Sequence, residues 1–352
     1  MLSAFALVSV RSRVRLARVS SAAVALGMLS LCSMGYSAEN IAQIPEKVPP
    51  GTTLSIGDPR TQRALELSGE LKNLPFKVKW ANISGGPGTI EAFRADALDL
   101  GSVADIPPIH ATWTGLSVRI IGASFRKIPL DHPIYKLGIA PGSNINSIAD
   151  LRGKKIAYSP GQAQGALVLR IPQKAGLSQK DVTLIEMPST GDVYVSALAS
   201  KLVDAAPIGE ANQPRFLINY GPNGAKLIAH GLRDDAWYIY ARKSVLDDPA
   251  KAAAAREYIK AWARATEWIY KHPDEWVKGY YVEQQGLSAK DGSYLTTSAG
   301  EPDFPGTWND VIARQQATID LLAVETHKPR LVAGDLFDKR YETVAAYALK
   351  GK

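Results

Sequence analysis

Short apolar runs alternate with stretches of helical periodicity from residue 53 to about residue 241. The runs that predict β-strands are Thr53–Ile56, Lys77–Ala81, Leu98–Ser102, Ser117–Ser124, Lys136–Ala140, Lys155–Tyr158, Val182–Glu186, Lys226–Ala229 and Trp237–Ala241. The stretches that predict helices lie near Arg60–Lys72, Thr89–Ala97, Ala163–Ala175 and Gly191–Ser200. Strands that alternate with helices are typical of an α/β fold with parallel strands.

The pattern changes to long helices after residue 249. Apolar residues recur at helical spacing through Ala250–His272, which predicts one long amphipathic helix. Pro273 ends this helix and opens the next, since a proline is tolerated in the first turn. Trp308–Leu322 predicts a further helix. Within the earlier helix at residues 163–175, Pro172 predicts a kink because it lacks a backbone N–H.

The first 38 residues have the order basic, apolar, small that is typical of a secretory signal peptide. Their apolar stretch, from about residue 22 to 31, is shorter than the roughly 20 residues that span a bilayer. The leader contains no acidic residue and carries Arg11, Arg13, Arg15 and Arg18. We therefore expect residues 1–38 to be removed on export to the periplasm, with a buried N-terminal helix as the alternative. Residues 39–52, which contain three prolines, predict a linker.

The one cysteine of the chain, Cys32, lies inside this leader. A lipid anchor at Cys32 is disfavoured because Leu31 stands where lipoprotein processing prefers a small residue. Cleavage downstream leaves a chain without disulfides, thiolate catalysis or cysteine-ligated metal. A chain of this length instead depends on large cores, which favours two lobes.

Charge and motifs exclude several functions. Removing the four leader arginines lowers the formal charge from +7 to +3, and no dense basic stripe suggests nucleic acid. The five histidines show no metal-ligand spacing. Neither a phosphate loop nor a nucleophile elbow is present. We expect no metal, no cofactor and no enzymatic activity.

Two glycine-rich junctions between a strand and a helix are candidate binding loops: Asn82–Thr89 and Ser159–Gly165. Glycine lets the backbone approach a ligand, and the free N–H groups of a helix's first turn attract anions. Each junction alone is also an ordinary turn. Placed at equivalent strand ends of two lobes, they would form opposite jaws of a cleft.

Two carboxylates are candidates for the same cleft. Asp105 precedes a helix expected to start at Pro107, so it is either an N-cap or a ligand-facing acid. Glu210 follows a strand and is either a second ligand-facing acid or a solvated hinge residue.

Four blocks of the sequence resemble, in order, the sulfonate, nitrate and taurine family of solute-binding proteins. They are Gly88–Ile109 (GTIEAFRADALDLGSVADIPPI), Pro141–Met187, His272–Trp276 and Trp308–Leu322. The similarity runs over roughly residues 53 to 345. It implies a type II periplasmic-binding fold of two α/β lobes joined by a two-stranded hinge. Lobe 1 would comprise residues 53–137 and 238–352, and lobe 2 residues 138–237.

The resemblance also implies a function and a site. The protein would be the monomeric ligand-capturing subunit of an ABC importer, closing around a small organic anion and docking on a membrane permease. Backbone N–H groups and hydroxyls at strand ends would hold the anion. The residues that map to the pocket are Gly85, Gly86, Ser159, Gln162, Ala163 and Gln164, completed by Asp58, Arg60, Ala104 and Asp105, with Glu210 and Trp237 beside them.

The identity of the anion stays open at this point. Carboxylates at Asp105 and Glu210 favour a zwitterion such as an amino sulfonate, whose amine would lie between them. Arg60 together with Arg63 would instead suit nitrate or bicarbonate, whereas Trp237 or Tyr238 would favour an organic tail or a pyrimidine precursor. The family resemblance extends to a desulfinase with a cysteine nucleophile, a chemistry closed to a mature chain without cysteine.

Overall fold

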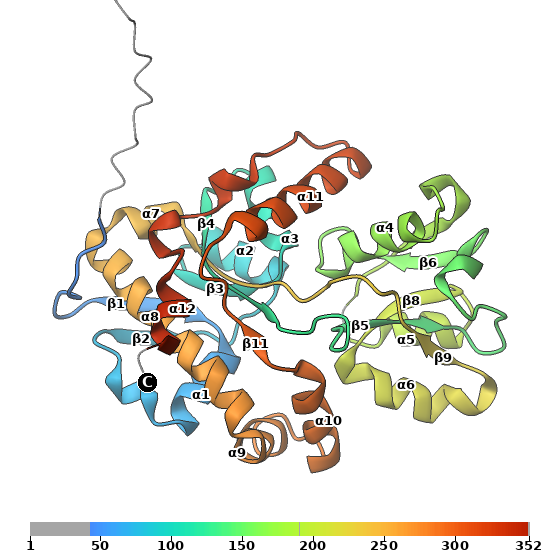
Figure 1. The fold of residues 1–352 in the computed structure, drawn as a ribbon, viewed down its shortest axis with the longest axis horizontal. Helices are drawn as coiled ribbons and strands as arrows, with labels where there is room; N and C mark the ends of the chain where they lie inside the picture. Colours follow the sequence, from blue (N-terminus) through green and yellow to red (C-terminus); the bar gives the residue numbers. More distant parts are fainter. Residues whose placement is uncertain (1–42, 190, 351–352) are drawn as a thin grey trace, which may run out of the picture. The chain divides into compact units, whose positions relative to one another are not determined.

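The computed structural model describes residues 43–189 and 191–350. The expected signal peptide (1–38), Cys32 and the first residues of the expected linker lie outside this part of the chain. The described residues contain two mixed β-sheets, each flanked by helices (Figure 1). This arrangement agrees with the α/β class that the alternating pattern predicts.

The first sheet has six strands in the order β11-β4-β10-β3-β1-β2. β1 pairs in parallel with β2 and β3, whereas β10 is antiparallel to both β3 and β4, as is β11 to β4. The strands are β1 (Thr53–Gly57), β2 (Lys77–Trp80), β3 (Leu100–Val103), β4 (Val118–Arg126), β10 (Trp237–Arg242) and β11 (Pro302–Asp303).

The helices around this sheet come from both ends of the described chain. They are α1 (Pro59–Leu67), α2 (Gly86–Arg94), α3 (Ile106–Trp113), α7 (Lys243–Asp247), α8 (Pro249–Lys271), α9 (Pro273–Trp276), the π-helix η6 (Val277–Val282), α10 (Ala289–Ala299), α11 (Asn309–Glu325) and α12 (Val344–Lys350). Short 3₁₀ turns add η1 (Glu70–Asn73), η7 (Ala333–Leu336) and η8 (Lys339–Tyr341).

The core of this half explains the near-continuous apolar sequence of β4. Seven of its nine residues are buried because helices cover both faces of the sheet. Gly122 marks the closest approach of α8: a Cβ there would lie 2.9 Å from Ile259 Cδ1 and 3.0 Å from Trp262 Cζ3. On β10, the Tyr240 hydroxyl lies 2.6 Å from Thr89 Oγ1 of α2.

Among the described residues, none of the helices combines the length and the apolar composition that a membrane span requires.

The second sheet has five strands in the order β7-β6-β8-β5-β9. Its strands are β5 (Tyr135–Ile139), β6 (Lys155–Tyr158), β7 (Thr183–Glu186), β8 (Ala205–Gly209) and β9 (Lys226–Ile228). Its helices are α4 (Gln164–Lys174), α5 (Val193–Ala199) and α6 (Gln213–Tyr220), with 3₁₀ turns η2 (Ile148–Leu151), η3 (Gln179–Asp181), η4 (Glu210–Asn212) and η5 (Gly221–Asn223). Successive strand residues enter separate apolar clusters, Ile156 one and Ala157 the other, as strand alternation requires.

Two segments connect the sheets, residues 127–134 and 229–236. Asp234 ties them together, because its carboxylate accepts hydrogen bonds from the backbone N–H groups of Ile134 (3.1 Å) and Tyr135 (2.7 Å). His230 Nε2 lies 2.9 Å from Tyr135 O, while its Nδ1 accepts from the Leu232 N–H. The boundary expected after residue 137 falls inside β5, all of whose residues pair with β8 of the second sheet.

Each of the nine strands predicted from apolar runs is present, and no end is shifted by more than two residues. Helix α2 begins at Gly86, three residues before the expected start, so that the glycine-rich loop already forms its first turn. Helix α4 continues past Pro172 to Lys174, and the kink expected there stays a prediction. The apolar runs did not predict β8, which was expected only as the strand before Glu210, or β11, which has only two residues, or the π-helix.

Candidate functional site

The carboxyl ends of β1, β2, β3, β6 and β8 lead into the loops that carry most of the residues expected to bind a ligand. In open α/β sheets, ligands bind in the crevice outside the carboxyl ends of the strands. The loops of the first sheet precede α1, α2 and α3, and those of the second precede α4 and η4. We therefore built the candidate site from these loops.

Asp58 follows β1 and is the N-cap of α1. Its carboxylate accepts from the Thr61 N–H (3.1 Å), the Thr61 hydroxyl (2.7 Å) and the Tyr258 hydroxyl (2.9 Å). Burial raises the pKa of this carboxyl, while the bonds from Thr61 and Tyr258 oppose the rise. Asp58 thus has a complete set of protein partners, and a contact with ligand stays a prediction.

The two glycine-rich loops lie against each other. Gly85 adopts φ +76°, which opens α2 without a side chain at its N-cap. A Cβ on Gly86 would lie 2.8 Å from Pro107 Cγ and 3.7 Å from Gly161 O of the loop before α4. The two jaws expected from the sequence are therefore neighbours in the structure, although they come from different sheets.

A cavity of about 290 Å³, here the Arg60 cavity, opens beside the loop after β1. Aromatic rings form much of its wall, and its lining includes Arg60, Arg126, Glu210, Trp237, Tyr270, Tyr280 and Tyr281. Two other residues expected to bind ligand, Glu210 and Trp237, thus lie here together with Arg60. Because strand residues alternate in direction, β10 sends Trp237 into this cavity and Tyr238 into a different one.

Arg60 is half-buried, and its guanidinium forms no hydrogen bond or ion pair with any residue that the structure describes. The guanidinium lies over the ring of Trp276, at 5.8 Å from the ring centroid. Arg63, one helical turn further along α1, is fully engaged with Glu66 (3.3 Å), Glu283 (3.2 Å) and the carbonyl of Gly279 (3.0 Å). The pair of free arginines that an inorganic anion would use is therefore not formed.

Glu210 is not a free carboxylate. Its two oxygens lie 3.2 and 3.4 Å from Arg126 Nη2, and Arg126 Nη1 also donates to the carbonyls of His132 (2.5 Å) and Ser298 (3.1 Å). Burial raises the pKa of Glu210, and the charge of Arg126 opposes that rise. The side chain is 22% exposed, so a solvated hinge acid also describes it poorly.

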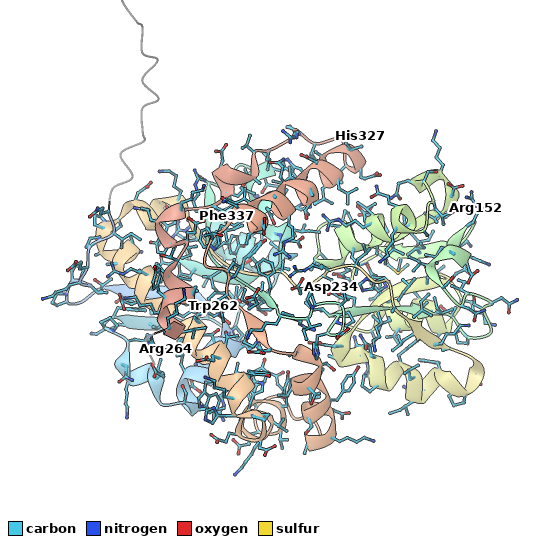
Figure 2. The ribbon with its side chains drawn as sticks, viewed as in Figure 1. Arg152, Asp234, Trp262, Arg264, His327 and Phe337 are labelled. Atoms are coloured by element: carbon cyan, nitrogen blue, oxygen red, sulfur yellow. The ribbon has the colours of Figure 1, made fainter. Side chains whose placement is uncertain are left out.

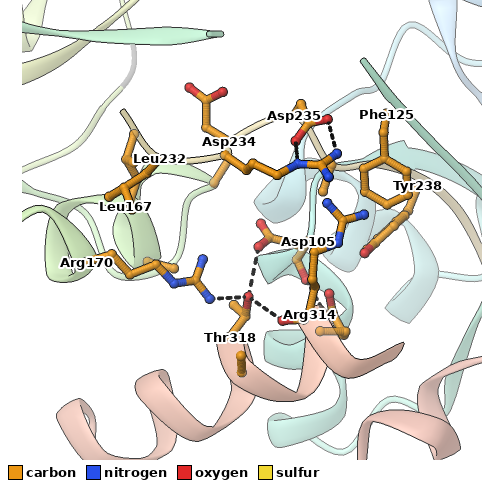
Figure 3. Close-up of a pocket in the computed structure, with 16 residues that line it drawn as sticks. Asp105, Phe125, Leu167, Arg170, Leu232, Asp234, Asp235, Tyr238, Arg314 and Thr318 are labelled. Atoms are coloured by element: carbon orange, nitrogen blue, oxygen red, sulfur yellow. Dashed lines mark hydrogen bonds and ion pairs between the residues drawn. The ribbon is translucent and has the colours of Figure 1, made fainter. Parts of the chain in front are cut away.

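A second cavity, of about 270 Å³, is here called the Asp105 cavity (Figure 3). Asp105 stands at the N-cap position of α3, but its side chain makes no capping bond. It accepts instead from the Thr318 hydroxyl of α11, at 3.2 Å. Burial raises the pKa of Asp105, and Arg170 lowers it. The Asp105 and Glu210 carboxylates therefore line different cavities, which does not support the expectation of one amine held between them.

The remaining expected residues are distributed as follows. Ala163 lines the Asp105 cavity, and Gln162 and Gln164 line a third cavity of about 240 Å³, where the Tyr135 hydroxyl donates to Gln164 Oε1 at 3.4 Å. Gly85, Gly86, Ala104, Ser159 and Asp58 line none of these three cavities. The first two cavities share Phe125 and Asp235 in their walls.

Sequence reasoning missed Arg126, Arg314 and the tyrosines of the π-helix. Arg126 meets Glu210 across 84 positions of the chain, a pairing that no local pattern encodes.

Two relatives named for aliphatic sulfonate binding are similar to this chain. The one from Escherichia coli (strain K12) is 34% identical over 106 residues, 30% of this chain and only 32% of that protein's length. The one from Bacillus subtilis (strain 168) is 26% identical over 248 residues, 70% of this chain and 71% of that protein.

Solved structures show the same fold at low identity. The alkanesulfonate-binding protein from Xanthomonas axonopodis pv. citri bound to MOPS has a TM-score of 0.67 and 21% identity, covering 82% of this chain and 98% of that one. The periplasmic aliphatic sulphonate binding protein from Escherichia coli has a TM-score of 0.69 and 20% identity, over 84% and 92%. A desulfurization enzyme also shares the fold, with a TM-score of 0.57 and 17% identity over 85% and 99%.

These structures confirm the two-lobed periplasmic-binding fold that the sequence resemblance implies. A family model described as NMT1/THI5 like matches residues 78–276, from β2 through the end of α9, which is more than half of the chain. The protein belongs to the NMT1/THI5-like family.

Proposed function

We propose that the protein is the solute-binding subunit of an ABC importer and that it captures a small organic sulfonate in the Arg60 cavity. The observation that carries this proposal is the free guanidinium of Arg60 in a cavity walled by aromatic rings. The names of the relatives, which refer to aliphatic sulfonates, support the same ligand class.

The chemistry of the cavity suits an anion with an organic part. A guanidinium presents five N–H donors in a planar fork, and charge-assisted hydrogen bonds to an oxyanion are stronger than neutral ones. The rings of Trp237, Tyr270 and Tyr281 would remove the organic part of the ligand from water. Arg63 is engaged elsewhere and Arg126 is paired with Glu210, so an inorganic anion such as nitrate or bicarbonate would find one free arginine and much unused apolar wall.

The two glycine-rich jaws would complete the site. The first N–H groups of α2 and α4 would face the ligand together with the loop after β1, because helix N-termini favour anions. Gly85, Gly86 and Ser159 do not line the Arg60 cavity in this structure, so in this proposal their backbone N–H groups reach the ligand only when the two halves close. The halves built on the two sheets would close on it by a hinge motion at the two connecting segments.

The rest of the proposal concerns location and partners. A cleaved leader at residues 1–38 would place the mature chain in the periplasm, where it would deliver ligand to a membrane permease. We propose that it is not an enzyme, although a desulfurization enzyme shares the fold. The single cysteine, Cys32, falls in the expected leader, so a thiolate nucleophile would be missing from the mature chain.

Titration calorimetry of the mature chain tests this proposal. We expect saturable binding of ethanesulfonate and taurine, little binding of nitrate or bicarbonate, and no product by mass spectrometry. Arg60→Gln should weaken sulfonate binding about 10- to 100-fold, as expected for losing a charged hydrogen bond of about 1.5–3 kcal/mol. Arg63→Gln is the matched control on the same helix. Equal effects of the two substitutions, or turnover of the sulfonate, would contradict the proposal.

A further inference from the structure

The Asp105 cavity is formed by elements of both halves (Figure 3). Helix α4 contributes Leu167 and Arg170, with Ala163 at its N-cap position, and helix α11 of the other half contributes Arg314, Gln315 and Thr318. Figure 2 shows how Asp234, one of its wall residues, lies between the two halves. Neither Arg60 nor Trp237 is part of its lining. The cavity is therefore not required by the function proposed above.

Arg314 is the first unusual feature of this cavity. Its guanidinium lies 3.9 Å from the centroid of the Phe125 ring. It makes no hydrogen bond or ion pair with any described residue, whereas the neighbouring Arg233 binds Asp235 through two bonds of 2.7 and 3.0 Å. Burial and the charge of Arg233 both lower the pKa of Arg314. A half-buried cation without an acid is unfavourable unless an anion joins it.

Arg170 is the second cation of this cavity whose guanidinium has N–H donors without an acidic partner. Its Nη2 donates to the Thr318 hydroxyl at 2.8 Å, and the same hydroxyl lies 3.2 Å from Asp105 Oδ2. Arg170 has no carboxylate within ion-pair distance in the described part of the chain. Of the acids nearby, Asp235 is engaged by Arg233 and by the Arg126 N–H (2.9 Å). Asp234 accepts two backbone bonds in the hinge.

An unmet acceptor lies beside these cations. Gln315 is 1% exposed, and its Nε2 donates to the Asp105 carbonyl at 2.8 Å. Its Oε1 is buried and has no hydrogen-bond partner in the part of the chain that the structure describes. Buried polar atoms are nearly always paired, so an orphan on a cavity wall points to a donor supplied from outside the chain. The Tyr238 hydroxyl, which also lines the cavity, has no partner among the described residues.

We infer that the Asp105 cavity is a second binding site, for a small oxyanion that also carries an N–H or O–H donor. Arg314 and Arg170 would take the oxyanion, and the Gln315 amide oxygen would take the donor. Asp105 would add a second acceptor, best used by an amine. The apolar residues Phe125, Leu167 and Leu232 leave room for a short carbon chain. Because the occupant would contact α4 and α11 at once, its binding would hold these helices together.

A matched set of sulfonates tests the inference: taurine carries an amine, isethionate a hydroxyl, and ethanesulfonate neither. Calorimetry is performed on Arg60→Gln, in which the site proposed for function should be weakened about 10- to 100-fold. We expect this variant to retain one site that binds taurine and isethionate about tenfold more tightly than ethanesulfonate. Adding Arg314→Gln should remove it, and adding Arg330→Gln, at an exposed arginine paired with Asp320, should not.

A further variant separates recognition from folding. Gln315→Met keeps the volume of the side chain but removes the amide oxygen, so it should erase the preference for donor-bearing sulfonates while some anion binding remains. Loss of all binding in Arg60→Gln alone would overturn the inference, as would equal effects of Arg314→Gln and Arg330→Gln. Failure of the functional proposal would look different, because Arg60→Gln would then change nothing while Arg314→Gln still removed a site.

Discussion

Replacing Glu210 with Gln separates two roles for this residue. In the structure the carboxylate binds Arg126, and the side chains of Arg126 and Glu210 are 12% and 22% exposed. A hydrogen bond between charged groups contributes about 1.5–3 kcal/mol to stability. Solvent screening reduces that value for a partly exposed pair, so we expect Glu210→Gln to lower the free energy of unfolding by about 1–2 kcal/mol. The melting temperature should fall by about 2–6 °C.

Circular dichroism and calorimetry measure the two sides of this prediction. Glu257→Gln is a suitable control, because Glu257 is similarly exposed and ion-paired but lies on α8 with Arg256 and Lys260. Since Arg126 already occupies the Glu210 carboxylate, the ratio of taurine to ethanesulfonate affinity should stay unchanged in Glu210→Gln. A loss of affinity of about tenfold or more for taurine but not for ethanesulfonate would refute this reasoning and would show that Glu210 binds the amine of the ligand.

Three further predictions follow from single contacts. Gly86→Ala places a Cβ 2.8 Å from Pro107 Cγ and should weaken sulfonate binding in calorimetry, whereas Gly161→Ala, with open space around it, should not. Asp58→Ala removes an N-cap and a buried acceptor and should lower the free energy of unfolding in urea by about 1–2 kcal/mol; no change would contradict its structural role. Burial lowers the pKa of His110, so the folded state binds fewer protons than the unfolded state and stability should fall as the pH drops below about 6.5. His110→Gln should flatten that pH dependence, and an equal flattening by His327→Asn at an exposed site would contradict it.

The strands and most helices followed from the sequence because their signals are local. An apolar run such as that of β4 can be satisfied only by burial on both faces, and the Pro273 that ends α8 acts within one turn. The glycine-rich loops could be predicted equally well, because the positive φ of Gly85 is a local backbone property that glycine adopts readily.

The sequence did not predict which cavity each site residue would line, because this depends on partners far away in the chain. Asp105 was a credible N-cap, yet its carboxylate binds Thr318, 213 positions later. Glu210 looked like a free acid until Arg126, 84 positions earlier, neutralised it. Such partners compete directly with the local role or with the ligand. A sequence that shows an acid near a cleft therefore says little about whether that acid is available.

The presence of arginine side chains that are not paired with acids, rather than the net charge, explains how a chain of weak positive charge could select anions. The protein itself binds most acids near the cleft: Asp58 accepts from Thr61 and Tyr258, and Asp235 is held by Arg233. Arg60 and Arg314 keep their guanidinium groups free of acids in the described structure, one on each side of β10. Attraction for an anion then comes from a few half-buried donors at short range and not from a long-range field. Binding carried by such donors should depend less on ionic strength than binding steered by surface charge, because buried pairs are screened least.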